Sequence, residues 1–156
     1  MIEIGISTKK NLQIFQLVLD YNGTIACDGV LIEGVASLIE KLSEDLEIHI
    51  LTADTQGSVI SQVGNLPCIV SIIPEGSEDL SKDEFVRSLG SSKTACIGNG
   101  RNDRLMLRNS AIGIALIGKE GASGDAIEGA DIIVTSIIDA LELFLYPIRL
   151  KATVRV

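Results

Sequence analysis

Polar side chains suited to phosphoryl transfer follow one another along the chain, each close behind an apolar run. Asp20 ends "FQLVLD", Thr52 ends "EIHILT", Lys82 follows "PCIVSIIP", and the loop "GNGRND" at 98–103 follows "KTACI". An aspartate can attack phosphorus and form an aspartyl-phosphate. A hydroxyl and a lysine can hold the other phosphoryl oxygens, and Mg²⁺ on oxygen ligands can offset the repulsion between carboxylate and phosphate. Each residue alone also fits a turn, a cap or a surface, but their joint order predicts phosphoryl transfer through Asp20.

These side chains can meet only if the apolar runs are neighbouring strands of one parallel sheet. The pattern predicts strands at 14–20, 46–52, 67–74 and 93–98 and helices at 30–45, 55–64, 81–90 and 101–110, and the segments 111–116, 125–130, 131–135 and 136–146 continue the alternation. We expect Thr55 and Ser81 to cap their helices and Gly90 to end one. Such alternation predicts an α/β fold, a three-layer sandwich around a parallel sheet. Ligands of these sheets bind at the carboxyl ends of the strands.

Length and composition bound the class of protein. The chain has 156 residues, so we expect one domain over 1–156, and 46% hydrophobic against 3% aromatic residues predict an aliphatic core. The opening runs "IEIGIS" and "LQIFQ" suggest an extra hairpin at the sheet edge. A net charge of −8 argues against nucleic acid and anionic membranes as partners. No apolar run reaches the roughly 18 residues that span a bilayer, so membrane insertion is not expected.

Cysteine usage predicts a cytoplasmic location. Cys27, Cys68 and Cys96 are odd in number and lack CxxC spacing, so we expect free thiols in a reducing compartment. The opening "MIEIGISTKK" lacks the basic start and apolar middle of a signal peptide. His49 is the single histidine, and we expect it to be structural rather than a zinc ligand.

The polar motifs, taken in order, resemble those of the haloacid-dehalogenase (HAD) superfamily of phosphotransferases. Within it the likeness is to the phosphorylation domain of P-type ATPases, in a small soluble form. "DYNGT" (20–24) resembles DKTGT, "LTADT" (51–55) resembles the TGD motif, and "GNGRNDRLML" (98–107) resembles GDGxND. Lys82 aligns with the family lysine, and the tail from 126 onward also resembles the ATPases. The likeness spans the chain from about residue 16.

The resemblance implies a Mg²⁺-dependent phosphohydrolase or phosphotransferase with a capless HAD-like fold. It implies a catalytic set of Asp20, Thr52 and Lys82, and a phosphate- or substrate-binding set of Gly23, Thr24, Ala53 and Asn102. It implies that Mg²⁺ binds to Asp20 and Asn22, with Asn99 or Asp103 completing the protein's ligands.

Two departures from the family motifs affect the expected chemistry. Most phosphatases of the superfamily carry a general acid and base where this chain has Asn22, and an amide cannot transfer a proton at neutral pH. The ATPases also lack an acid there, and their aspartyl-phosphate is long-lived. We therefore expect slow hydrolysis of ordinary phosphomonoesters. The metal-binding acid of GDGxND is Asn99 here, which keeps a ligating oxygen but loses its charge.

The spacing of the motifs leaves no room for a cap or for the nucleotide-binding domain of the ATPases. Positions 21–51 separate Asp20 from Thr52 and are predicted to hold a single helix. We therefore expect an open site, an unidentified phosphorylated substrate and no assumed use of ATP. An open site and the apolar end segment "LELFLYPIRLKATVRV" also suggest a homo-oligomer, although the segment could instead pack on its own chain.

Three other functions compete with the enzyme. A receiver domain also places Asp, Thr and Lys at strand ends, but no acidic pair precedes Asp20 here. A dinucleotide site would put Asp103 where GxGxxG has its third glycine, against a pyrophosphate. The strongest rival is a regulatory or binding module that kept the fold after two acids became amides.

Overall fold

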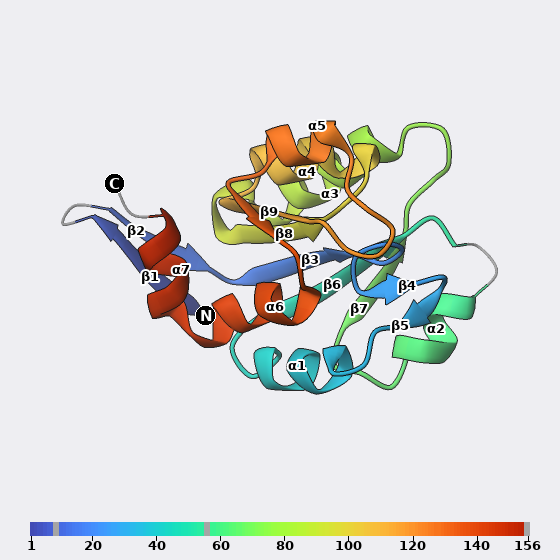
Figure 1. Ribbon diagram of the computed structural model, residues 1–156, viewed down its shortest axis with the longest axis horizontal. Helices are drawn as coiled ribbons and strands as arrows, with labels where there is room; N and C mark the ends of the chain where they lie inside the picture. Colours follow the sequence, from blue (N-terminus) through green and yellow to red (C-terminus); the bar gives the residue numbers. More distant parts are fainter. Residues whose placement is uncertain (8–9, 55–56, 155–156) are drawn as a thin grey trace.

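Six parallel strands form the central sheet of the computed structural model, which describes residues 1–7, 10–54 and 57–154 (Figure 1). In spatial order they are β10 (Ile132–Val134), β9 (Ile112–Leu116), β8 (Thr94–Gly98), β3 (Gln16–Asp20), β6 (Glu47–Thr52) and β7 (Ile69–Ile72). All neighbouring pairs run parallel. The predicted α/β sandwich with a parallel sheet is therefore confirmed.

Helices cover both faces of the sheet. Figure 1 shows α1 (Val35–Leu42) and α6 (Ile137–Leu145) on one face, and α3 (Glu78–Leu89), α4 (Arg104–Asn109) and α5 (Gly124–Gly129) on the other. The core divides accordingly, because successive residues of β3 point to opposite faces: Leu17 and Leu19 belong to one buried cluster and Val18 to the second. Burial of aliphatic side chains on both faces explains why the strands are apolar throughout.

The order in which the chain adds strands to the sheet changes side after β7. From central β3 it adds β6 and β7 on one side, then crosses to β8 on the other side of β3 and continues outward to β9 and β10. Connections from β3 and β8 thus leave in opposite directions and open a crevice at their carboxyl ends. Asp20 and Gly98 are the last residues of these two strands.

A small hairpin replaces the start of the helix predicted at 30–45. β4 (Ala26–Cys27) pairs with β5 (Val30–Leu31), and the two residues between them, Asp28 and Gly29, have φ of 51° and 75°. Two left-handed residues form the tight turn that matches the twist of a hairpin. The helix begins only after Gly34, so the prediction for 30–34 is wrong. The helix α2 (Ser58–Val63) contacts this hairpin.

Other predicted boundaries shift by a few residues. α3 begins after Ser77, not at the predicted cap Ser81, because Glu78 and Asp79 supply acidic side chains that favour a first turn. Gly90 ends this helix as predicted, while Thr55 lies outside the described residues. The strand predicted at 67–74 is only Ile69–Ile72. The helix predicted at 101–110 is a 3₁₀ turn, η2 (Arg101–Asp103), followed by α4, and a second 3₁₀ turn, η1 (Ser91–Lys93), precedes β8.

The N-terminal hairpin forms a sheet of its own. β1 (Ile2–Ser7) pairs with β2 (Lys10–Ile14), and this pair does not join the six-stranded sheet, so the predicted place at its edge is wrong. Figure 1 shows the hairpin beside α7 (Pro147–Val154), away from the strand ends that carry Asp20. Its apolar face is buried with Leu150 of α7, which holds it there instead of in edge pairing.

The end segment largely covers its own chain. Leu141, Phe144 and Leu150 are buried, while Ile148 remains 83% exposed. A homo-oligomer through this segment stays a prediction. Within the described residues no helix is long and apolar enough to cross a membrane.

The remaining singled-out side chains have ordinary surroundings. All three cysteines are free thiols, as predicted. His49 is buried in β6, where Nε2 lies 2.7 Å from Glu47 Oε1 and the ring meets Phe85 edge-on at 5.4 Å, as expected for a structural residue.

Candidate active site

A buried lysine between two carboxylates is the centre of the site. Lys82 Nζ donates to Asp20 Oδ1 and to Asp103 Oδ1, each at 2.7 Å. Lys82 comes from the second turn of α3, Asp20 from the end of β3 and Asp103 from the 3₁₀ turn after β8. All three are at most 7% exposed. The cluster carries a net charge of −1, because one ammonium faces two carboxylates.

Burial makes these charges interact strongly. Removal from water and the nearby Asp103 carboxylate raise the pKa of Asp20 to about 7, against the lowering effect of Lys82 and Thr24. Burial alone would lower the pKa of Lys82, but attraction to both carboxylates and its hydrogen bonds raise it above the ordinary value. Lys82 therefore stays charged, and Asp20 gains a proton far more easily than a surface aspartate. An additional cation beside Asp20 would favour the ionised carboxylate.

The second oxygen of Asp20 faces a group of oxygen atoms. Thr24 Oγ1 lies 3.1 Å from Asp20 Oδ2 and 3.2 Å from Asn99 Oδ1. The hydroxyl has a single proton, so it can serve only one of these two acceptors at a time. The side-chain amide of Asn99 donates to the carbonyl of Gly121 at 3.1 Å, which turns its oxygen toward Thr24 and Asp20. The arrangement leaves one acceptor without a donor.

Gly23 allows this close approach. Its φ is 77°, and a Cβ at this position would lie 2.4 Å from the Asn99 side chain. Any larger residue would therefore be strained and would push Asn99 away from Asp20. The turn is closed by hydrogen bonds from the amides of Thr24 and Ala26 to the carbonyl of Tyr21.

Asp103 organises the loop after β8. Its Oδ2 accepts from the amides of Asn99 and Gly100 at 2.9 and 2.8 Å, while Oδ1 accepts from Lys82. Both oxygens thus already hold donors, which fits a positioning role for a carboxylate expected among the metal ligands. A Cβ on Gly98 would lie 2.5 Å from the Asp103 side chain, so only glycine at position 98 leaves space for this carboxylate.

The other predicted site residues lie around this centre with different partners. Thr52 is buried at the end of β6, one residue after Leu51, which pairs with Asp20, and its Oγ1 accepts from the Asp54 amide at 3.1 Å. Ala53 follows it and is half-buried. Asn102 donates to Glu78 Oε2 at 2.6 Å, which ties the loop to the start of α3. The structure records no contact of Asn102 with Asp20 among the described residues.

Asn22 lies in the turn directly after Asp20 and is exposed. Its backbone forms an isolated bridge with Ala26, which fixes the turn. Oxygen atoms of Asp20, Asn22 and Asn99 are the donor type that Mg²⁺ prefers, and one buried oxygen of the Thr24 group lacks a proton donor. On these grounds the residues present fit a Mg²⁺ ion.

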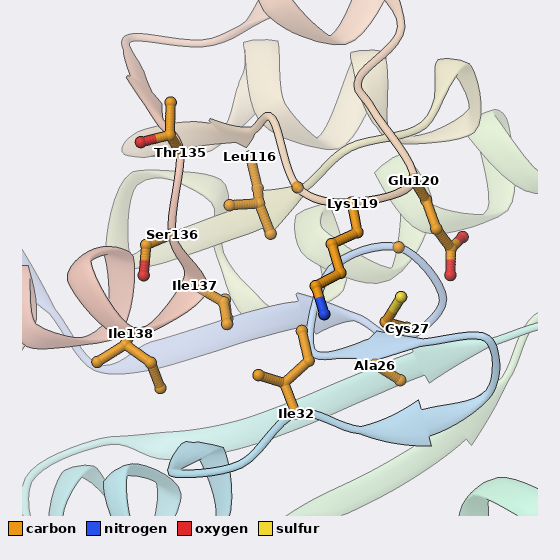
Figure 2. A pocket seen from close by; sticks show the side chains of 12 residues that line it. Ala26, Cys27, Ile32, Leu116, Lys119, Glu120, Thr135, Ser136, Ile137 and Ile138 are labelled. Atoms are coloured by element: carbon orange, nitrogen blue, oxygen red, sulfur yellow. The ribbon is translucent and has the colours of Figure 1, made fainter.

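A pocket beside the site was not foreseen from the sequence. It has a volume of about 240 Å³ and lies between the turn at Gly23, the β4 strand, the loop after β9 and the start of α6 (Figure 2). Its apolar wall includes Ile32, Ile137 and Ile138. These residues are distant in sequence and follow ordinary helix and strand patterns, so no local signal marks them.

The comparisons place the chain in a family. No family model matches it. The "Uncharacterized protein MJ0073" of Methanocaldococcus jannaschii is 45% identical over 84 residues, which cover 51% of this chain and 90% of that protein. The chain belongs to the same family as MJ0073. The "Uncharacterized protein MJ0072" of the same organism is 54% identical over 39 residues, covering 25% of this chain and 89% of that protein.

Solved structures identify the fold of this MJ0073-family chain. It matches 3-deoxy-D-manno-octulosonate 8-phosphate phosphatase of Moraxella catarrhalis, solved with magnesium and phosphate, at TM-score 0.71 and 17% identity over 86% of this chain and 87% of that one. The cobalt-bound enzyme of Haemophilus influenzae gives TM-score 0.71 and 12% identity over 86% and 89%. A zinc-transporting PIB-type ATPase in the E2.Pi state gives 0.59 and 26% over 80% of this chain and 20% of that one.

These matches show the HAD fold, which the sequence motifs predicted, and they include an ATPase as expected. The two phosphatases are matched over most of their length, 87% and 89% of each chain.

Proposed function

We propose that this MJ0073-family protein is a phosphohydrolase or phosphotransferase that acts through an aspartyl-phosphate at Asp20. The observation that carries the proposal is the cluster at the crevice between β3 and β8. There Lys82 holds one oxygen of Asp20, and Thr24 and Asn99 surround the other. The Asp20 carboxylate has a fixed cation, Lys82, at one oxygen, and the oxygen atoms of Thr24 and Asn99 lie beside the other. An ion pair that served only stability would not need this second group of oxygen atoms.

The first step transfers the phosphoryl group to the protein. An Asp20 oxygen attacks phosphorus, the bond between phosphorus and the leaving-group oxygen breaks, and that oxygen keeps the electron pair. Lys82 offsets negative charge on the phosphate and on Asp20, and the Thr52 hydroxyl holds a phosphoryl oxygen. Asn22 cannot supply a proton, so the leaving group departs as an anion or takes a proton from water. Substrates with stable leaving anions are therefore favoured.

The second step returns Asp20 to its free form. Water attacks phosphorus, and the bond from phosphorus to Asp20 breaks with its electron pair left on the Asp20 carboxylate. One hydrogen of the water stays on the new phosphate oxygen, and the second proton passes to another phosphate oxygen or to solvent. No carboxylate is placed at position 22 to take that proton, so the covalent intermediate persists. Gly23, Thr24 and Ala53 would shape the phosphate site by backbone and hydroxyl donors. Asn102 would bind the substrate from the loop after β8.

Mg²⁺ would be held by Asp20, the carbonyl of Asn22 and Asn99, and it would supply positive charge beside the attacking carboxylate. In this proposal Asp103 is a positioning residue, because it orients Lys82 and the amides of the loop rather than offering a free oxygen.

The test is covalent labelling. We expect acetyl phosphate with Mg²⁺ to add one acid-stable, base-labile phosphate at Asp20, detected by intact-mass and peptide mass spectrometry. Asp20→Asn should abolish labelling and turnover, while Asp45→Asn, a matched change at an exposed aspartate before β6, should leave both unchanged. Absence of the label in wild type, together with no Mg²⁺-dependent turnover that Asp20→Asn removes, would refute the nucleophile.

The second candidate is a regulatory or binding module. It is favoured by the two amides, Asn22 and Asn99, at positions where phosphatases of the superfamily carry acids. Saturable Mg²⁺-dependent binding of phosphate without labelling or turnover would identify it. A cytoplasmic location and a homo-oligomer are further proposals, to be tested by fractionation and by light scattering at micromolar concentration.

A further inference from the structure

The pocket of Figure 2 shares a wall with the proposed phosphorylation site. Gly23 lines the pocket, and the same glycine lies against the side chain of Asn99 in the Asp20 cluster. Ala26, at the end of the same turn, also lines it. The pocket therefore lies directly beside the turn that follows Asp20, although among the described residues no side chain of the Asp20 cluster lines it.

The wall of the pocket is mostly apolar and has one cation. Ile32, Leu116, Ile137 and Ile138 form the apolar part. Figure 2 shows Lys119 reaching across the pocket toward Ile32. The adjacent Glu120 points away, and its Oε1 accepts from the amide of Asp28 at 2.8 Å. Within the described ranges Lys119 forms no ion pair with a carboxylate of its own chain.

The larger hollow on the other side of the crevice differs in this respect. It is lined by Gly76 and by charged residues that already pair with protein groups: Arg104 with Asp79 at 2.9 Å and Arg101 with Asp125 at 2.8 Å. Both guanidinium groups are thus already paired with carboxylates of the protein, although Arg104 Nε has no hydrogen-bond partner within the described part of the chain. The apolar pocket, in contrast, offers an unpaired ammonium beside uncovered aliphatic side chains.

We propose that this pocket binds the leaving group of the substrate, and that the leaving group has a compact apolar body and an anionic substituent, such as a carboxylate, that meets Lys119. At about 30 Å³ per water-sized group, a volume of about 240 Å³ holds roughly eight such groups, the size of a single substituted ring or a short branched chain. The inference rests on the proposed function and adds its substrate class.

The experiment compares three phosphoryl donors: acetyl phosphate, phenyl phosphate and 4-carboxyphenyl phosphate. Each is tested on wild type, Lys119→Met, Ile32→Trp and the control Lys41→Met, which removes an exposed lysine at the far end of α1. For each variant we take the ratio of kcat/KM between two donors, which removes differences in the fraction of active protein. Comparing that ratio between variants then removes the intrinsic difference in reactivity between the donors.

We expect Lys119→Met to lower the ratio of 4-carboxyphenyl to phenyl phosphate about two- to fivefold, the range for a solvent-accessible ion pair. Ile32→Trp fills the pocket and should lower the ratio of either aryl phosphate to acetyl phosphate about tenfold or more. Lys41→Met should change neither ratio. Ratios that stay at the wild-type value in both pocket variants, with acetyl phosphate still turned over, would overturn the pocket assignment alone.

If no donor reacts, the proposed function fails, and the pocket is then judged by binding. Titration with 4-hydroxybenzoate should give saturable amide shifts in the NMR spectrum at Ala26, Gly118 and Ile137 that Ile32→Trp removes. Absence of saturable shifts at these amides would overturn the pocket assignment as well.

Discussion

Removing the ammonium of Lys82 should destabilise the protein by up to about 3 kcal/mol at pH 8, the full amount being reached only while Asp20 stays ionised. Lys82 Nζ is 2.7 Å from one oxygen of Asp20 and 2.7 Å from one oxygen of Asp103, so these oxygens are no more than twice that distance apart. Two negative charges at that separation repel by about 3 kcal/mol at an effective dielectric constant of about 20. The value agrees with the roughly 3–5 kcal/mol expected when a buried ion pair loses one partner.

The assay is urea unfolding of Lys82→Met, a change that keeps most of the side-chain volume. The free energy of unfolding should fall by up to about 3 kcal/mol at pH 8, less the part that a proton taken up by Asp20 relieves, with an unchanged m-value. The loss should shrink at pH 5, because Asp20, whose pKa is raised in the folded state, takes up a proton there and the repulsion disappears. Adding Asp20→Asn to Lys82→Met should restore most of the loss at pH 8.

Two results would contradict this account. A loss below about 0.5 kcal/mol, equal to that of the surface control Lys41→Met, would mean that the two carboxylates do not depend on Lys82. A double variant no more stable than Lys82→Met would mean that lost packing, and not charge repulsion, causes the effect.

Three further outcomes follow from the site and the core. Asn22→Asp should speed hydrolysis of the aspartyl-phosphate by about 10²-fold, the low end for general acid–base catalysis, measured as the decay of the mass label; an unchanged lifetime would show that position 22 does not activate water. Asn99→Asp should tighten Mg²⁺ binding, seen as a larger rise of the unfolding temperature with Mg²⁺, and should lower stability without the ion because the bond to Gly121 is lost. Cys96, fully buried with a pKa raised to about 12 by desolvation, should resist iodoacetamide at pH 8 while Cys27 and Cys68 react; equal labelling of all three in the folded protein would contradict the sheet assignment.

The strands of the parallel sheet and the residues at their ends were predictable because both depend on local patterns. Apolar runs that end in Asp20 and Gly98 specify where buried strands stop, and parallel pairing then brings those ends to one edge. The hairpin at 26–31 was missed, because Val30 and Leu31 match a helical pattern equally well and only the left-handed turn at Asp28 and Gly29 decides.

Contacts between distant segments were not predictable from spacing. The second bond of Lys82, to Asp103, depends on how far α3 leans toward the loop after β8. The pocket depends on α6 and β4 meeting across the sheet end, which no single segment specifies. The residue types of the site could therefore be predicted from the sequence. That Asp103 accepts hydrogen bonds from Lys82 and from the loop amides is visible only in the folded structure.

The surroundings of Asn99 bear on whether its amide marks decay or adaptation. Its NH₂ group donates to the carbonyl of Gly121, and its oxygen faces Thr24 at 3.2 Å. A carboxylate in the same pose would place an oxygen about 3.1 Å from the Gly121 carbonyl oxygen, a contact between two acceptors that is unfavourable without a proton or cation between them. Gly121 itself holds a φ of 76°, so this carbonyl is oriented by a backbone conformation that suits glycine. The loop thus complements an amide and not an acid, and it still directs one oxygen toward Asp20. Such complementarity agrees with the proposed phosphoryl transfer, in which Asn99 would be a weaker metal ligand than a carboxylate.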